Sequence, residues 1–265
     1  MHRIATFLLS VSLLLATALV AAFPAPAAER KYVNGIDRDY PPFAYIDPLT
    51  RKPAGFDVES MDWIAKTMGF EVSHVPVPLD NIISALRREQ IDMICSGLSI
   101  TAERAKIIDF SHPYWEVDRV FVTRADNPLT PSNMSAANIV LGVKWGTSES
   151  EAILREHRQG IRSFELRHYE SFDIIIEEVV AGRIDAGYID EPPADAAIAK
   201  GVPIVKTPGQ GGPDRIAVGV RDDDTELLNL VNEGYRRLMA DPKWEELQRK
   251  HFTTRQGGQG ASEGK

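Results

Sequence analysis

The chain has 265 residues, which at about 150 residues per domain favours two structural units. Hydrophobic residues make up 43% of the chain and charged residues 26%. This composition is that of a globular protein and excludes a collagen-like, coiled-coil or wholly disordered chain. The single cysteine, Cys95, excludes an intramolecular disulfide, an iron–sulfur cluster and a thiolate zinc site, while the net charge of −8 disfavours nonspecific binding to nucleic acid or an anionic membrane.

The N-terminal residues are typical of an export signal. Basic Arg3 precedes an almost unbroken apolar run from Ile4 to Phe23, and small residues follow at Ala25 and Ala27. We therefore expect residues 1–27 to be a cleaved signal peptide. The alternative is a permanent membrane anchor, since about 20 apolar residues can span a bilayer. An exported soluble protein without a disulfide fits the periplasm.

The next part of the chain alternates strand and helix patterns. Its expected elements are a strand over Tyr32–Ile36, a helix over Val58–Met68, a strand over Glu71–Val77, a helix over Leu79–Leu86 and a strand over Ile91–Ser96. The helices are indicated by apolar residues that recur every three or four positions, and Gly69 is well placed to end the first of them.

The second half repeats this order. We expect a strand over Ile139–Val143, a helix from Ser148, a helix over Phe172–Val179, a strand over Ile184–Ile189 and a helix that begins at Pro192 and Pro193. Ser148 and Glu151, three residues apart, predict a capping box at the first of these helices. The two prolines suit the first turn of the last helix.

This alternation predicts parallel sheets in an α/β protein with two lobes. The apolar segments at residues 120–122 and 216–220 are expected to cross between the lobes, and an amphipathic helix from Leu227 to Leu238 is expected to pack on the first lobe. The predicted division is lobe 1 over residues 28–121, lobe 2 over 122–215, a return to lobe 1 over 216–256 and a disordered tail over 257–265.

Polar residues follow the predicted strands, at the edge where open parallel sheets bind ligands. Backbone N–H groups at the expected helix starts near Ser99 and Ser148 favour an anion, and Arg104 can add a bidentate contact to the same carboxylate. Asp190, on the other lobe, can accept an ammonium group. Together these residues predict an α-amino acid bound between the lobes.

Each of these residues also has a purely structural alternative. Ser99 and Ser148 can be helix caps, and Asp190 can cap the helix that follows it. Arg104 can pair with the nearby Glu103 or Asp109.

The common motifs of nucleotide-binding proteins, zinc proteases and serine hydrolases do not occur in the sequence. The six histidines do not have the spacing of metal ligands. We therefore expect no catalytic residue, metal or cofactor.

Several ordered stretches resemble one known family, the polar amino-acid-binding proteins of bacterial ABC importers, which are family 3 of the solute-binding proteins. These stretches are Gly55–Glu59, Ser96–Arg104, Asp109–Tyr114, Gly142–Thr147 and Gly182–Ala186. The resemblance extends from about Tyr32 to Phe252, and Ser60 departs from it because an apolar residue is usual there. It implies the two-lobed periplasmic-binding-protein (Venus flytrap) fold of type II, which closes on a two-strand hinge.

The resemblance also implies roles for individual residues. Arg104 and the backbone N–H groups of Ser99 and Ser148 would bind the α-carboxylate of the ligand. Asp190 and the carbonyl of Gly97 would bind its α-ammonium. The rest of the predicted ligand-binding set comprises Asp37, Tyr40, Leu79, Ser96, Lys144 and Gly146.

The ligand side chain is predicted from Asp37 and Lys144. Asp37 alone would favour a basic side chain, because a buried carboxylate requires a partner. Asp37 and Lys144 together offer an acceptor and a donor, which suits an amide, and glutamine-binding relatives are similar in carrying this pair. Glutamine is therefore favoured, and a basic or acidic amino acid is the alternative.

The implied function is that of a free, monomeric importer subunit in the periplasm, with an L-amino acid and an inner-membrane ABC permease as partners. Cyclohexadienyl dehydratases share the fold but have a catalytic glutamate where this sequence has Pro193, which cannot transfer a proton. Receptor sensor modules usually continue into a membrane helix, and no later apolar run of about 18 residues follows here.

Overall fold

The computed structural model describes residues 30–129, 139–159, 164–209 and 212–252. The predicted signal peptide and the predicted tail lie outside these residues. Within the described ranges, every helix is too short or too polar to cross a membrane.

The first sheet has five strands in the order β5-β1-β6-β15-β7. Their bounds are β1 Arg30–Ile36, β5 Phe70–Pro76, β6 Met93–Ile94, β7 Asp109–Phe110 and β15 Gly219–Val220. β6 is parallel to β1, but β15 is antiparallel to both β6 and β7. The expectation of an entirely parallel sheet is therefore wrong, because β15, which returns from the other sheet, runs antiparallel to both neighbours.

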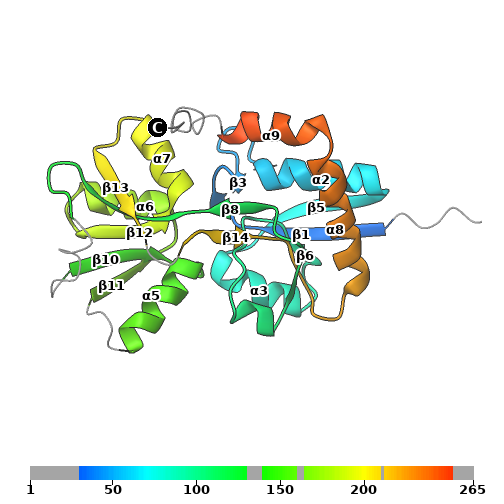
Figure 1. The fold of residues 1–265 in the computed structure, drawn as a ribbon, viewed down its shortest axis with the longest axis horizontal. Coiled ribbons are helices and arrows are strands. Elements are labelled where there is room, and N and C mark those ends of the chain that lie inside the picture. Colours follow the sequence, from blue (N-terminus) through cyan, green and yellow to red (C-terminus); the bar gives the residue numbers. More distant parts are fainter. Residues whose placement is uncertain (1–29, 130–138, 160–163, 210–211, 253–265) are drawn as a thin grey trace, which may run out of the picture. The chain divides into compact units, whose positions relative to one another are not determined.

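Four α-helices accompany this sheet, with α2 and α3 on opposite sides of it (Figure 1). They are α2 Phe56–Met68, α3 Leu79–Arg87, α8 Thr225–Met239 and α9 Pro242–Phe252. α2 ends as predicted, because Gly69 adopts the left-handed conformation (φ 77°) that glycine accepts without strain. α8 packs on α2 so closely that a Cβ atom on Gly234 would lie 2.3 Å from Ile64 Cγ2, which confirms the predicted packing of the helix over Leu227–Leu238 on the first lobe.

The second sheet has the order β11-β10-β12-β9-β13. Its strands are β9 Arg119–Arg124, β10 Ile139–Lys144, β11 Phe164–Tyr169, β12 Ala186–Asp190 and β13 Ile204–Pro208. β10 is parallel to β11 and β12, whereas β9 is antiparallel to β12 and β13. This sheet is therefore also mixed, because β9, which enters from the other sheet, runs antiparallel to both of its neighbours.

Three helices flank the second sheet, with α6 and α7 on one side and α5 on the other (Figure 1). They are α5 Ser148–Arg158, α6 Phe172–Val180 and α7 Glu191–Ala199. The prolines after Asp190 occupy the first turn of α7, as predicted.

Two short strands connect the parts built on the two sheets, which we call lobe 1 and lobe 2. β8 (Trp115–Val117) is antiparallel to β14 (Asp214–Ile216). The predicted lobe boundary between residues 121 and 122 falls within β9, which pairs along its length with strands of the second sheet. The pairing therefore favours a boundary a few residues earlier, near Asp118, and the division into lobes stays a prediction.

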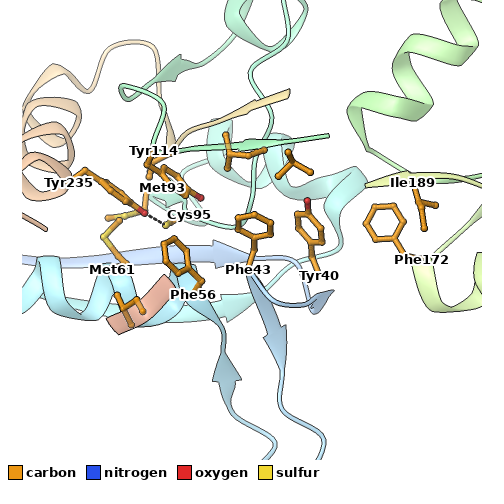
Figure 2. Close-up of a cluster of buried hydrophobic side chains, with 14 of the residues drawn as sticks. Tyr40, Phe43, Phe56, Met61, Met93, Cys95, Tyr114, Phe172, Ile189 and Tyr235 are labelled. Atoms are coloured by element: carbon orange, nitrogen blue, oxygen red, sulfur yellow. Dashed lines mark hydrogen bonds between the residues drawn. The ribbon is translucent and has the colours of Figure 1, made fainter. Parts of the chain in front are cut away.

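A small sheet of β2 (Asp39–Tyr40), β3 (Ala44–Ile46) and β4 (Pro53–Ala54) precedes α2. It carries Tyr40 into a row of aromatic rings (Figure 2). The ring centroid of Tyr40 lies 5.0 Å from that of Phe43 in lobe 1 and 5.6 Å from that of Phe172 in lobe 2. The buried apolar side chains of the two lobes are therefore continuous through Tyr40.

Cys95 is buried directly after β6, and its Sγ atom lies 3.2 Å from the hydroxyl oxygen of Tyr235 (Figure 2). Burial raises the pKa of its thiol well above the usual range. Cys95 is therefore a packed, unreactive residue, as expected.

Candidate functional site

A small cavity lies where residues that follow β1, β6 and β10 meet the end of β12. Its volume is about 20 Å³, so it is much smaller than an amino acid. The predicted site residues that line it are Asp37, Tyr40, Leu79, Ser96, Gly97, Ser99, Arg104, Ser148 and Asp190. The cavity is this small because polar side chains from the two lobes contact one another across it.

The first of these contacts joins Asp37 and Lys144. The Lys144 Nζ atom donates to Asp37 Oδ2 at 2.5 Å and to the Asp39 carbonyl at 2.9 Å, and the side chains of Lys144 and Asp37 are both buried. The Ser96 hydroxyl accepts the backbone N–H of Asp37 at 2.8 Å, and this hydrogen bond fixes the position of Asp37. Lys144 also lies 4.9 Å from the centre of the Phe172 ring, a cation–π contact. Lys144 and Asp37 thus form a buried ion pair beside the cavity.

The second contact joins Tyr40 and Asp190. The Tyr40 hydroxyl donates to Asp190 Oδ2 at 2.5 Å. Asp190 Oδ1 and Glu149 Oε1 are both buried without a hydrogen-bond partner among the described residues. Burial, together with the nearby carboxylate of Glu149, raises the pKa of Asp190 well above its usual range. The cavity therefore has an excess of buried carboxylates, which favours a cationic group of a ligand.

The third contact joins Arg104 and Glu151. Arg104 Nε and Nη2 both donate to Glu151 Oε1, at 3.2 Å and 3.1 Å. Arg104 also donates to the carbonyls of Ser99 and Gly146, each at 2.9 Å. Glu151 belongs to α5 of lobe 2. The structural alternative, in which Arg104 pairs with Glu103 or Asp109, is therefore wrong, because the ion-pair partner of Arg104 is Glu151.

The start of α5 differs from the predicted capping box. The N-cap residue is Thr147, whose hydroxyl accepts the backbone N–H of Ser150, because the helix begins one residue earlier than a Ser148 cap would require. Ser148 instead donates its hydroxyl proton to Asp214 of β14. Glu151 is thereby left available to Arg104.

Two other sequence expectations near the cavity are also wrong. Ser99 forms an isolated β-bridge with Ile216 instead of starting an α-helix. The next helical element in the described part of the chain is the 3-10 turn Arg104–Lys106. Asp190 is the N-cap residue of α7 but, among the described residues, makes no side-chain hydrogen bond as a cap. Both residues are instead directed to the cavity.

Gly146 and Leu79 meet where lobe 2 contacts the start of α3. Gly146 has φ 75°, and a Cβ atom on it would lie 2.7 Å from the backbone nitrogen of Asp80 and 2.9 Å from the carbonyl carbon of Leu79. The close approach of these two backbones thus requires glycine.

Asp57, in the first turn of α2, supports the Gly97 end of the cavity. Asp57 Oδ2 accepts the backbone N–H of Gly97 at 2.5 Å and the hydroxyl of Tyr114 at 2.8 Å. Asp57 Oδ1 has no partner in the described part of the chain. Burial raises the pKa of Asp57 from 3.8 to about 7.

This raised pKa predicts how folding stability depends on pH. Unfolded Asp57 ionises near pH 4 and folded Asp57 near pH 7, so the free energy of unfolding falls as the pH rises through this window. In Asp57→Asn we expect the fall between pH 5 and pH 8 to be smaller by about 2 to 3 kcal/mol, at 1.36 kcal/mol per pKa unit. Urea unfolding at both pH values measures this difference. The control is Asp223→Asn, at an exposed position before α8, and an unchanged slope in Asp57→Asn would contradict the prediction.

The predicted ligand-binding set does not include several residues that line the cavity, namely Leu98, Thr147, Glu149 and Phe172. The most consequential is Glu149, which is buried although it is charged. Its position soon after the end of β10 was the available signal, because ligands bind outside the carboxyl ends of the strands in open α/β sheets.

The comparison with protein families agrees with this architecture. A family described as bacterial extracellular solute-binding proteins, family 3, matches residues 32–254. The chain belongs to this family. Its two-lobed fold and its resemblance to amino-acid-binding proteins are thereby confirmed.

Several proteins similar to this chain are described as amino-acid-binding or were solved with an amino acid bound. The histidine-binding periplasmic protein of Salmonella typhimurium is 31% identical over 257 residues, which is 92% of this chain and 95% of the relative. An ABC uptake transporter substrate-binding protein from Streptococcus pneumoniae, solved with bound histidine, has a TM-score of 0.78 at 26% identity and covers 84% of this chain and 92% of its own. An ancestral arginine-binding protein solved with glutamine has a TM-score of 0.73 at 26% identity, over 84% of this chain and 97% of its own.

Proposed function

We propose that this family 3 protein is the extracytoplasmic solute-binding subunit of an amino-acid ABC importer and binds a polar L-amino acid between its lobes. The observation that carries the proposal is a pair of buried carboxylate oxygens, on Asp190 and Glu149, that lack a hydrogen-bond donor among the described residues and lie in a cavity that Arg104 also lines. An α-ammonium would supply the cation that these carboxylates lack, and Arg104 would bind the α-carboxylate. Gly97 and the backbone N–H groups of Ser99 and Ser148 would complete the binding of the two charged ends.

The proposal includes a location and a partner. Residues 1–27 would direct export and then be removed, leaving a monomer in the periplasm that delivers its ligand to an inner-membrane permease. The relative from Salmonella typhimurium, described as periplasmic, supports this location.

Glutamine is the ligand that we favour. Lys144 and Asp37 form a buried donor–acceptor pair next to the cavity, and an amide can insert between them with both of its polar ends satisfied. A cationic side chain would lie close to Lys144 and be repelled by it. The solved ancestral arginine-binding protein with bound glutamine supports this choice.

A basic amino acid is the second candidate, and Glu149 is the observation that favours it. Glu149 adds a buried carboxylate beyond the one that the ligand ammonium would neutralise. The histidine-binding relative and the histidine-bound structure agree with this alternative.

Replacing Lys144 by alanine is expected to separate the two candidates by the sign of its effect. For glutamine, the change removes a donor to the side-chain oxygen and should weaken binding by about 1.5 to 3 kcal/mol. For arginine or lysine, it removes a repelling charge and should tighten binding. Titration calorimetry with each ligand measures the change.

Lys206→Ala is the matched control, because Lys206 also belongs to lobe 2 and pairs with Glu191 and Asp195 away from the cavity. This variant should bind like the wild type. Unchanged binding of every ligand by Lys144→Ala would remove Lys144 from the site.

The proposed function is tested by a binding panel of the 20 amino acids against mature protein that has been unfolded and refolded to remove carried-over ligand. We expect at least one polar L-amino acid to bind and to be recovered chemically unchanged. Turnover of prephenate or arogenate would instead favour the dehydratase alternative. Pro193 speaks against that reaction, because it lies outside the cavity lining and has no titratable group.

A further inference from the structure

The guanidinium group of Arg104 is occupied by the protein itself. Its Nε and Nη2 atoms converge on a single oxygen of Glu151, at 3.2 Å and 3.1 Å. The other oxygen of Glu151 accepts the hydroxyl of Thr101 at 3.3 Å. Lobe 1 provides Arg104 and Thr101, and lobe 2 provides Glu151, so this cluster joins the two lobes.

The edge that Glu151 occupies is one that carboxylates bind. The Nε–Nη2 edge of arginine presents two parallel N–H groups to an acidic group. A ligand α-carboxylate and the carboxylate of Glu151 have the same charge and shape. Both therefore compete for the same donors of Arg104.

Asp190 shows the same arrangement at the other end of the cavity. Its Oδ2 atom accepts the hydroxyl of Tyr40, which belongs to lobe 1, at 2.5 Å. Both groups that we assign to the charged ends of a ligand are thus engaged by side chains of the opposite lobe. Tyr40 engages a single oxygen of Asp190, whereas Glu151 takes a whole edge of Arg104.

We propose that Glu151 is an affinity-determining residue that acts as an internal competitor of the ligand α-carboxylate. This inference rests on the proposed function, in which Arg104 binds that carboxylate. Glu151 holds Arg104 and links the lobes when no ligand is bound, and an incoming amino acid displaces it. The free energy needed to break this ion pair lowers the observed affinity of the site for its ligand.

The exposure of the pair makes such displacement feasible. The side chain of Arg104 is 4% exposed, whereas that of Glu151 is 34% exposed. Glu151 can therefore turn into water when its place is taken, while Arg104 stays in the cavity. A partly exposed ion pair is weak enough to be broken by a fully enclosed carboxylate.

The test is Glu151→Gln, which keeps the length of the side chain and removes its charge. For the amino acid that binds best in the panel, we expect the dissociation constant to fall by about fivefold or more. The amide of the same amino acid, whose α-carboxylate is replaced by a carboxamide, should show no such gain. This difference separates competition for Arg104 from a general change in stability.

Glu165→Gln is the matched control, because it also removes an acid from lobe 2, where Glu165 pairs with the exposed Arg167. It should leave both dissociation constants unchanged. If Glu151→Gln does not fold, Glu151→Asp, which shortens the reach of the carboxylate, is measured against the same expectation.

Equal or weaker binding of the free amino acid by the Glu151 variant would overturn the inference, as would an equal gain for the amide. A wild-type protein that binds none of the 20 amino acids would instead overturn the proposed function. Small-angle scattering gives an independent readout. Without ligand, Glu151→Gln should have a larger radius of gyration than the wild type, and the two should agree with ligand bound.

Discussion

Replacing Arg104 by alanine is expected to weaken binding of the cognate amino acid by about 3 to 5 kcal/mol, a loss of more than about a hundredfold in affinity. The α-carboxylate would enter a cavity whose charged donor had been removed, and a buried anion without a partner is costly. Arg104 is itself buried, so water cannot easily replace it. Titration calorimetry on refolded protein measures the loss.

A second effect of this substitution must be separated from the first. Arg104→Ala also leaves Glu151 and two backbone carbonyls without their donor, so the free energy of unfolding should fall. In the double variant Arg104→Ala/Glu151→Gln, stability should recover in part while binding stays weak. Wild-type affinity in either variant would mean that Arg104 only connects the lobes.

Replacing Asp190 by asparagine is expected to weaken binding by about 2 to 4 kcal/mol. An amide can still accept a hydrogen bond from the ligand, but it cannot neutralise an ammonium group. Tyr40 retains an oxygen to which its hydroxyl can donate, so the contact between the lobes should persist.

Folding stability should change in the opposite direction. Burial raises the pKa of Asp190, so ionisation is harder in the folded than in the unfolded protein. Stability is therefore lost as the pH rises from the unfolded pKa through the folded one. Asparagine avoids this loss, and Asp190→Asn should be at least as resistant to urea as the wild type at neutral pH.

Asp126→Asn is the control for both measurements, since Asp126 is exposed in lobe 2 and pairs with Arg124. It should change neither binding nor stability. If Asp190→Asn binds normally, or if it loses stability and affinity together, Asp190 is a structural residue and not the acceptor of the ammonium group.

Local patterns in the sequence were sufficient for most of the secondary structure. The helix pattern that ends at Gly69 gave α2 and its C-cap, and Pro192 and Pro193 marked the first turn of α7. These features depend on a few adjacent residues and on backbone preferences, which any single sequence displays. The mixed direction of the sheets was missed because it depends on distant strands such as β15.

Nine of the eleven predicted ligand-binding residues line one cavity because strand ends meet in space, and their roles in binding stay a prediction. The charge balance of the cavity was not predicted, since Glu149 and Glu151 are acids in the first turn of α5, where acids are common for reasons of the helix dipole. Only the placement of Arg104 across from that turn shows that Glu151 has a partner in the other lobe. Sequence spacing within one helix contains no information about such a contact.

The aromatic row of Phe43, Tyr40 and Phe172 has a thermal consequence. If the lobes separate to admit a ligand, the facing surfaces of Tyr40 and Phe172 become hydrated, and hydration of apolar surface raises the heat capacity. Separation should then become easier on cooling, because the hydrophobic contribution weakens at low temperature. The rate constant for ligand association should accordingly give a curved Arrhenius plot.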